Sequence, residues 1–232
     1  MDTIAPTTIT PTTIAPKRAR RRTPLTRERV LRAALKLADE RGIEAVSMRK
    51  LGQVLHVEAM SLYRHVAGKE DILDGIADLV TSEFEVPAPG EHWREALRRS
   101  AISARRALLR HPWAGSVIES RTNPGPARLR YIDSVIGVMR DAGFDLATII
   151  RAFMALDSHT YGFALQEEAV PYDTARGPEV AAAVASSPDM GAYPNLVAMA
   201  ELAAASPPGA LLDFEFGLDR LLDGLERLRE QV

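Results

Sequence analysis

Apolar residues recur at intervals of three and four along most of this chain, and no segment alternates apolar and polar residues for long enough to form a convincing strand. Intervals of three and four place side chains on one face of an α-helix, whereas a half-buried strand requires a period of two. We therefore predict an all-α fold. Helical patterns cover residues 26–41, 47–55, 59–66, 69–85, 92–110, 126–142 and 146–169, and a last run from about Pro208 to the C-terminus. Residues 171–195 are rich in Pro, Gly, Ser and Ala, which predicts a mobile loop around a weak helix.

The pattern that says most about function lies in residues 47–66, SMRKLGQVLHVEAMSLYRHV. Two short helical runs flank a three-residue break at 56–58, and Ser47 is a suitable N-cap for the first run. A longer helical run, 26–41, precedes them. A supporting helix followed by helix, tight turn and helix is the arrangement of helix-turn-helix DNA-binding proteins, in which the last helix enters the major groove.

The outer face of this segment carries more polar and cationic side chains than packing requires. We expect Leu62 and Val66 to hold the second short helix against the core. The side chains left exposed on that helix are then Ala59, Met60, Ser61, Tyr63, Arg64 and His65.

Charge is unevenly distributed, although the net charge is only −2. Residues 1–66 contain 13 Lys and Arg against 6 Asp and Glu, a balance of +7, whereas the rest of the chain carries −9. Residues 1–16 are rich in Thr and Pro, and five cations follow within residues 17–23. This composition predicts a disordered tail with a basic arm over residues 1–22. A basic end on an acidic body suggests a polyanionic partner, although a solvated tail without a partner has the same composition.

Residues 25–80 resemble the DNA-binding domain of the TetR family of bacterial repressors. The matching features are AALKLADERG (33–42), SMRKL (47–51) and LYRHVAGKEDIL (62–73). Later segments resemble the ligand-binding domain of the tetracycline-repressor subgroup: HPW (111–113), MRDAGFDL (139–146), YGFALQEE (161–168) and FEFGLDRLLDGLE (214–226). The resemblance implies a DNA-binding head over residues 23–70 and a ligand-binding, dimerising body over residues 71–232. It also implies a repressor that binds a palindromic operator on double-stranded DNA as a homodimer and is released by a small-molecule effector.

The resemblance assigns roles to residues of the head. Arg49 matches an arginine that reads a guanine edge, which suits its two-pronged guanidinium. The other expected DNA contacts are Ser47, Lys50, Ser61, Tyr63, Arg64, His65 and Lys69. Ala59 and Met60 replace the Gln-Pro of the tetracycline repressor itself, so we expect a different operator preference. Several of these residues also have a structural interpretation, because Tyr63 can pack against the first helix, Arg64 can be solvated and Arg49 can form a surface ion pair.

For the body, the resemblance implies a ligand pocket between helices and a dimer interface. The candidate pocket residues are Trp113, Ile118, Arg121, Tyr131, Phe153, Asp157 and Tyr161, although the aromatic residues among them also suit a core. The candidate interface residues, on the last helix, are Phe214, Leu218, Leu221 and Leu225. This face would form a four-helix bundle with residues 146–169 across a two-fold axis, or it would pack within its own chain.

We expect no cofactor and no bound metal. Tetracycline repressors hold a drug-bound magnesium ion with a histidine and a glutamate, and the positions matched to them here are Val117 and Gln166. We therefore expect a different effector, a small apolar or aromatic compound. An enzyme is not supported, because motifs for metal, phosphate or nucleophilic chemistry are missing, and the adjacent residues Asp157, Ser158 and His159 would point in different directions on a helix. A DNA-binding dimer that responds to no ligand is the remaining alternative.

The composition also predicts a location. The chain has no cysteine, no apolar run near the roughly 18–20 residues of a membrane span and no hydrophobic signal-peptide core. We expect a cytoplasmic bacterial protein that associates with the nucleoid when it is bound to DNA, and no membrane partner.

Overall fold

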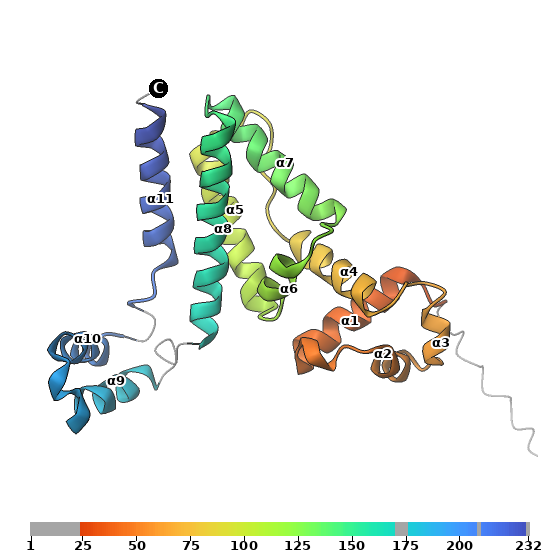
Figure 1. Ribbon diagram of the computed structural model, residues 1–232, viewed down its shortest axis with the longest axis horizontal. Coiled ribbons are helices and arrows are strands. Elements are labelled where there is room, and N and C mark those ends of the chain that lie inside the picture. Colours follow the sequence, from red (N-terminus) through yellow and green to blue (C-terminus); the bar gives the residue numbers. More distant parts are fainter. Residues whose placement is uncertain (1–23, 170–175, 208–209, 231–232) are drawn as a thin grey trace, which may run out of the picture.

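The computed structural model describes residues 24–169, 176–207 and 210–230, and this part of the chain is helical with no strand (Figure 1). The predicted all-α fold is confirmed. The predicted tail and basic arm, residues 1–22, lie outside the described residues. The elements are α1 (Arg27–Arg41), η1 (Ile43–Ala45), α2 (Met48–Leu55), α3 (Ala59–Leu62), α4 (Lys69–Thr81), α5 (Trp93–Arg110), α6 (Ala114–Ser120), α7 (Pro126–Asp141), α8 (Leu146–Ala169), α9 (Gly177–Ala185), η3 (Pro188–Ala192), α10 (Pro194–Ala205) and α11 (Phe214–Arg229).

The head consists of α1, α2 and α3, and its helix ends are set by local caps. The Thr26 side chain accepts a hydrogen bond from the Arg29 backbone at 3.2 Å and begins α1. Gly42 ends α1 at a φ of 79°, a conformation that glycine adopts without strain. The Ser47 hydroxyl accepts from the Lys50 backbone at 3.3 Å and begins α2.

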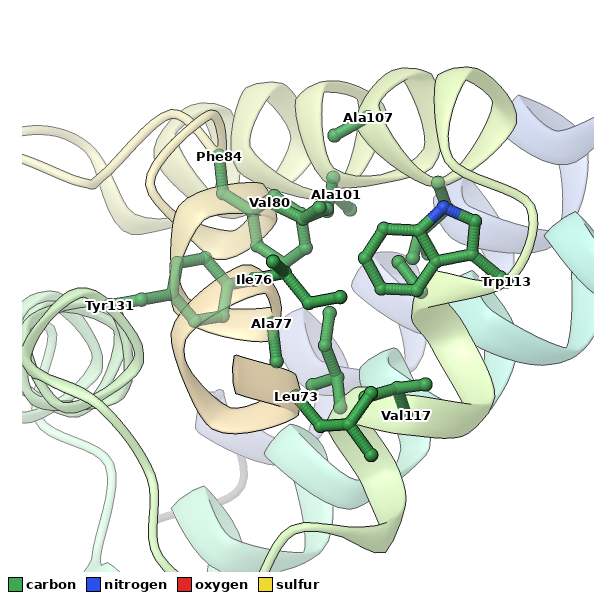
Figure 2. Packing of buried hydrophobic residues seen from close by; sticks show 14 of the residues in the cluster. Leu73, Ile76, Ala77, Val80, Phe84, Ala101, Ala107, Trp113, Val117 and Tyr131 are labelled. Carbon is green, nitrogen blue, oxygen red and sulfur yellow. The ribbon is translucent and has the colours of Figure 1, made fainter. Parts of the chain in front are cut away.

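Helix α4 belongs to the head and to the body at once. It packs on α1 on one side and on α6 and α7 on another. Figure 2 shows its apolar residues, among them Ile76 and Val80, packed with Trp113, which directly precedes α6, and with Tyr131 of α7. On a further face, the Asp78 carboxylate accepts from the backbone of Ala127 at 2.8 Å and so caps the start of α7. A movement of α4 would therefore change the packing of both the head and the body.

The body is built around α5, which contacts α7, α8 and α11. Helix α11 lies beside α8 (Figure 1), and ion pairs join it to α5: Arg94 to Asp223 at 2.5 Å and Arg98 to Asp219 at 2.9 Å. Helices α9 and α10 pack on each other and lie to one side of the remaining helices (Figure 1). No helix in the described ranges is long and apolar enough to cross a membrane.

Several predictions about the helices differ from the structure. The weak helix expected within residues 171–195 is present as α9, but residues 188–192 form a 3₁₀ turn and α10 begins at Pro194, where loop was expected; residues 171–175 lie outside the described residues. The helix predicted over 69–85 ends at Thr81. The last helix begins at Phe214 and not near Pro208, because the Asp213 side chain accepts from the Phe216 backbone at 2.9 Å and caps it there.

Candidate functional site

The helix-turn-helix depends on a close approach between α2 and the turn that follows it. A Cβ atom on Gly52 would lie 2.9 Å from the Val57 carbonyl oxygen and 3.3 Å from the Ala59 nitrogen, so only glycine fits there without a shift. His56 ends α2 in the left-handed region, at a φ of 56°. These two residues set the angle between α2 and α3.

Helix α3 is a single turn, shorter than the predicted run 59–66. Its N-cap, Glu58, makes no side-chain cap hydrogen bond. After Leu62 the chain tightens, with the His65 N–H donating to the Leu62 carbonyl at 2.8 Å, and it turns toward α4. The Leu62 and Val66 side chains are buried, as predicted.

The expected DNA-contacting cations lie at the surface of this unit. Arg49, Arg64 and Lys69 are exposed, and Lys50 and His65 are half-buried. Within the described part of the chain, none of the five forms an ion pair or a side-chain hydrogen bond. Many arginines of the body, by contrast, are engaged with carboxylates. The head therefore presents positive charge that nothing in its own described chain neutralises.

An open groove of about 750 Å³ runs between α2 and α3, and two of the expected DNA contacts line it. Arg49 and Ser61 line it together with Gln53 and His56. Tyr63 and Met60 lie on the outer side of α3, with 49% and 74% of their surfaces exposed. Ser47 differs from the other expected DNA contacts, because its hydroxyl already accepts the hydrogen bond that caps α2.

Four of the predicted pocket residues line two hollows formed by the described residues, and one common pocket for all seven stays a prediction. Trp113 and Tyr161 line a large cleft between the head and the body. Ile118 and Arg121 line a small hollow against α4. Tyr131 is buried in the core, and Phe153 and Asp157 are half-buried on α8.

The large cleft has a volume of about 1070 Å³. One wall is the end of α1 with η1, and the other walls come from α5, α6, the α5–α6 connection and the last turns of α8. Sequence analysis did not identify the α1 residues of this wall, because nothing local in residues 38–44 indicates that they face a cavity.

A partly buried polar cluster lies between α6, α7 and α8. The Arg128 guanidinium donates to the Tyr161 hydroxyl and to the Glu119 carboxylate, both at 3.0 Å, and lies 3.9 Å from Asp157. Burial raises the pKa of Asp157 to about 7, an effect that nearby Arg128 opposes. Burial also raises the pKa of Tyr161, which therefore stays a neutral phenol. Such polar groups inside an apolar body are typical anchors for a small organic ligand.

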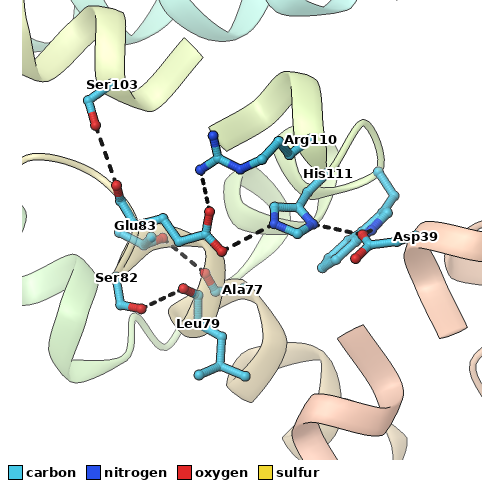
Figure 3. Close-up of polar contacts among 10 residues, drawn as sticks. Asp39, Ala77, Leu79, Ser82, Glu83, Ser103, Arg110 and His111 are labelled. Atoms are coloured by element: carbon cyan, nitrogen blue, oxygen red, sulfur yellow. Dashed lines mark hydrogen bonds and ion pairs between the residues drawn. The ribbon is translucent and has the colours of Figure 1, made fainter. Parts of the chain in front are cut away.

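A second polar network joins the head to the body (Figure 3). His111, which is 7% exposed, lies between α5 and α6. Its Nδ1 is 2.7 Å from the Asp39 carboxylate of α1, and its Nε2 is 3.2 Å from the Glu83 carboxylate that follows α4. The Trp113 indole N–H donates to the same Asp39 oxygen at 2.8 Å. The pKa of Glu83 is lowered, because hydrogen bonds from Arg110 and His111 outweigh its burial.

Most of the residues predicted for the dimer interface are buried by packing within their own chain. Phe214, Leu218 and Leu225 are buried, and α11 packs on α5 and α8; Leu221 is half-buried. The exposed apolar residues of this region lie elsewhere, at Leu146, Ile150 and Met154 of α8 and at Phe216 and Leu228 of α11. The three α8 residues follow each other at intervals of four and so share one helix face.

Two family models match the chain. Residues 30–76 match the model of bacterial regulatory proteins of the tetR family, and residues 86–229 match the tetracyclin repressor-like C-terminal domain. The two matches fall on the head with α4 and on the body, respectively.

Individual proteins are also similar over most of their length. The HTH-type transcriptional repressor DrrR1 of Streptomyces coeruleorubidus is 34% identical over 222 residues, which cover 89% of this chain and 79% of that protein. The class A tetracycline repressor of Escherichia coli, from transposon 1721, is 33% identical over 211 residues, which cover 89% and 93%. Among solved structures, the Streptomyces coelicolor TetR family protein ActR in complex with actinorhodin superimposes with a TM-score of 0.74 at 28% identity, covering 89% of this chain and 99% of that one.

Proposed function

This chain belongs to the tetR family of bacterial regulatory proteins, and we propose that it represses transcription by binding a palindromic DNA operator as a homodimer until a small-molecule effector releases it. As a member of this family it is a DNA-binding transcriptional regulator and not an enzyme. Its place of action is then the bacterial cytoplasm, on the nucleoid.

The observation that supports operator binding most directly is the set of cations on the helix-turn-helix that no residue of the described ranges pairs with. Arg49 and Ser61 share the groove between α2 and α3, where a base edge would enter. Lys69 lies at the start of α4, where the backbone N–H groups of a helix also favour a phosphate. In this proposal Arg49 reads a base, and Lys50, Arg64, His65 and Lys69 fix the position of the head on the phosphates.

A single copy of so short a recognition helix touches few base pairs, so the proposal requires two copies about 34–36 Å apart. We assign the dimer contact to the exposed apolar stripe of α8, Leu146, Ile150 and Met154, with the exposed side of α11. The role of Phe214, Leu218 and Leu225 is then indirect, because they are buried and hold α11 against α5 and α8.

The body supplies the response to the effector. ActR and DrrR1 are relatives from Streptomyces, and the ActR structure contains actinorhodin. An aromatic effector suits Tyr161 and the partly buried Arg128 that donates to it. A magnesium-bound tetracycline does not suit the chain, because Val117 offers no metal ligand at the position matched to the histidine of the repressor.

The test is selection of binding sites from random double-stranded DNA, followed by a mobility shift with the selected sequence. We expect an inverted repeat with half-sites about one helical turn apart. Selection of a single unrepeated site, or of none, contradicts the proposal. A thermal-shift screen of aromatic compounds tests the effector: a ligand raises the apparent stability by RT ln(1 + [L]/Kd), and failure of every compound favours a regulator that responds to no ligand.

A further inference from the structure

The turn of the helix-turn-helix contains a residue with an unusual backbone conformation. His56 ends α2 at a φ of 56° and a ψ of 45°, in the left-handed region. Apart from glycines, no other residue that the structure describes has a positive φ. Glycine adopts this region without strain, whereas a residue with a Cβ atom is strained there. Backbone strain of this kind is concentrated at functional sites.

The backbone on both sides holds His56 in this conformation. The Val57 N–H donates to the Gly52 carbonyl at 2.9 Å, and the His56 N–H donates to the Gln53 carbonyl at 3.3 Å. The close approach of Gly52 to the Val57 carbonyl leaves little room for a different path of the chain. The turn therefore fixes the direction of the Cα–Cβ bond of His56.

The His56 side chain has no structural partner that explains its presence. It is exposed, and no hydrogen bond, ion pair or ring contact joins it to another described residue. A glycine would form the same turn with less strain, so the fold of the head does not require the imidazole. A cation at the C-terminal end of a helix also interacts favourably with the helix dipole, and this is the structural alternative to a role in binding.

His56 lies on the surface of the head that faces DNA in the proposed function. Arg49, Gln53 and His56 follow each other at intervals of four and three, so they share one side of α2. All three line the groove between α2 and α3, together with Ser61. In helix-turn-helix proteins the first helix of the motif crosses the phosphate backbone, while the second enters the major groove. A side chain on this side of α2 therefore lies close to the phosphates that border the major groove.

The charge of the groove between α2 and α3 depends on His56. Among the described residues, the other ionisable groups of its lining are one cation, Arg49, and one carboxylate, Glu58, and none comes from α1 or α4. Both are exposed, and neither forms an ion pair within the described part of the chain. Their charges cancel, so the lining is neutral when His56 is neutral and carries a positive charge when His56 is protonated. Histidine is the side chain whose charge ordinarily changes between about pH 5 and pH 8.

We propose that His56 is a further DNA contact, and that its protonated imidazole binds a phosphate of the operator. The operator affinity then rises when His56 gains a proton. The contact rests on the proposed function, because it needs DNA against α2 and α3. It differs from the contact of Arg49, because a phosphate carries the same charge at every base sequence. His56 therefore sets the affinity and its pH dependence, and not the sequence preference.

The contact is tested with His56→Asn in mobility shifts on the selected operator at pH 6 and pH 8. Asparagine tolerates the left-handed region and cannot carry a charge. At pH 6 the variant should bind at least fivefold more weakly than the unmodified protein, and the slope of log K against log salt should be smaller by about 0.9 for each chain bound. At pH 8 the two proteins should agree within twofold. A loss of equal size at both pH values, or no loss at pH 6, overturns the proposal.

His92→Asn is the matched control. His92 is also exposed and also lies at a helix end, as the N-cap of α5, but it belongs to the body. This variant should keep the pH dependence and the salt slope of the unmodified protein, and the same changes as in His56→Asn would overturn the proposal. His56→Lys tests the charge, because lysine remains a cation at pH 8. It should bind the operator at pH 8 at least fivefold more tightly than His56→Asn, and failure to do so overturns the ionic contact.

A purely structural role at the end of α2 predicts a different result. If the imidazole only stabilised the helix end, His56→Asn would lower the melting temperature more at pH 6 than at pH 8 and would leave the salt slope unchanged. That outcome overturns the proposal. We expect the melting temperature of His56→Asn to equal or exceed that of the unmodified protein at both pH values, because asparagine is less strained in the left-handed region.

Random-sequence duplex DNA separates this proposal from the proposed function. A phosphate contact does not depend on base sequence, so the difference in salt slope between the unmodified protein and His56→Asn at pH 6 should also appear on DNA without the operator. If selection yields no operator, the proposed function fails, while this measurement still decides the role of His56. Absence of binding to any duplex overturns both.

Discussion

Arg49 and Lys69 are both exposed and have no partner among the described residues, but their positions predict different roles on DNA. Arg49 lines the groove between α2 and α3, whereas Lys69 begins α4. Arg49→Ala should cost about 1–3 kcal/mol of operator binding and relax base preference at one position of each half-site. The measurement is a mobility-shift series in which that position carries each of the four base pairs.

Lys69→Ala is the matched comparison. It should weaken binding to all sequences equally and reduce the slope of log K against log salt by about 0.9, because one phosphate contact is lost. Salt titrations of both variants distinguish the roles. If Arg49→Ala lowers the salt slope but leaves base discrimination intact, Arg49 contacts the backbone and does not read sequence.

Asp157 should make the stability of the body depend on pH. Burial raises its pKa to about 7 in the folded state, well above the roughly 3.9 of an exposed aspartate in the unfolded chain. Between these values the folded protein binds more protons than the unfolded one, so the free energy of unfolding falls as pH rises from about 4 to about 7. The full effect is on the order of 4 kcal/mol.

Asp157→Asn removes the titrating group and nearly preserves its shape. Urea denaturation at pH 5 and pH 8 should show the wild type losing more stability than the variant over this interval. Exposed carboxylates with lowered pKa values, such as Asp145, act in the opposite direction, but they are common to both proteins and cancel in the difference. Identical pH dependence in the two proteins would mean that Asp157 is solvated when the protein is folded.

The approach of α2 to its turn gives a prediction about the head. In Gly52→Ala the new methyl group would lie 2.9 Å from the Val57 oxygen, which is backbone and cannot rotate away. We expect a loss of about 1–3 kcal/mol in the free energy of unfolding and weaker operator binding. The control is Gly137→Ala in α7, where no atom lies within 4 Å of the new methyl group and helix propensity should increase stability by about 0.5–1 kcal/mol. A neutral Gly52→Ala would show that the turn adapts at little cost.

Helices could be predicted from the sequence where a periodic apolar pattern continues over many consecutive residues. The run 146–169 has the same bounds as α8, and 92–110 differs from α5 by one residue, because each carries a sustained apolar face. Helix α6 has only seven residues, too few for a period to stand out. Helix α10 was missed because its apolar residues are spread around the helix, leaving Leu196, Met199 and Leu202 exposed and only Ala200 buried.

The same distinction applies to the functional surfaces. The expected DNA contacts lie within 23 consecutive residues, so the spacing of two short helices was enough to group them. The cleft and its polar contacts join residues far apart in the chain, since Asp39 and His111 are separated by 72 positions. No periodicity can reveal such a pair, because it forms only when α1 docks on the α5–α6 connection.

The proposed dimer should depend on the apolar stripe of α8. Met154 is 61% exposed, and a carboxylate in its place would lose its hydration in the contact without gaining a partner. Met154→Glu should therefore convert the dimer to a monomer in sedimentation equilibrium and reduce operator affinity by orders of magnitude. Leu129→Glu, at an exposed position of α7 outside the stripe, should leave a dimer. A monomeric wild-type protein, or a dimeric Met154→Glu, would exclude this face as the interface.

Because α4 packs on α1, α6 and α7, the boundary between head and body does not fall in a linker. A chimera that joins the head of one relative to the body of another could be cut where the helix-turn-helix ends. Here such a cut, just before Lys69, would pair α1 with a foreign α4 and abolish the fit between Leu31 and Gly75. A cut after Thr81 would instead separate Ile76 and Val80 from Trp113 and Tyr131. Either chimera therefore needs one face of α4 redesigned. We expect that operator specificity and effector response can be exchanged between relatives only when both surfaces of α4, the one that contacts the head and the one that contacts the body, are transferred together.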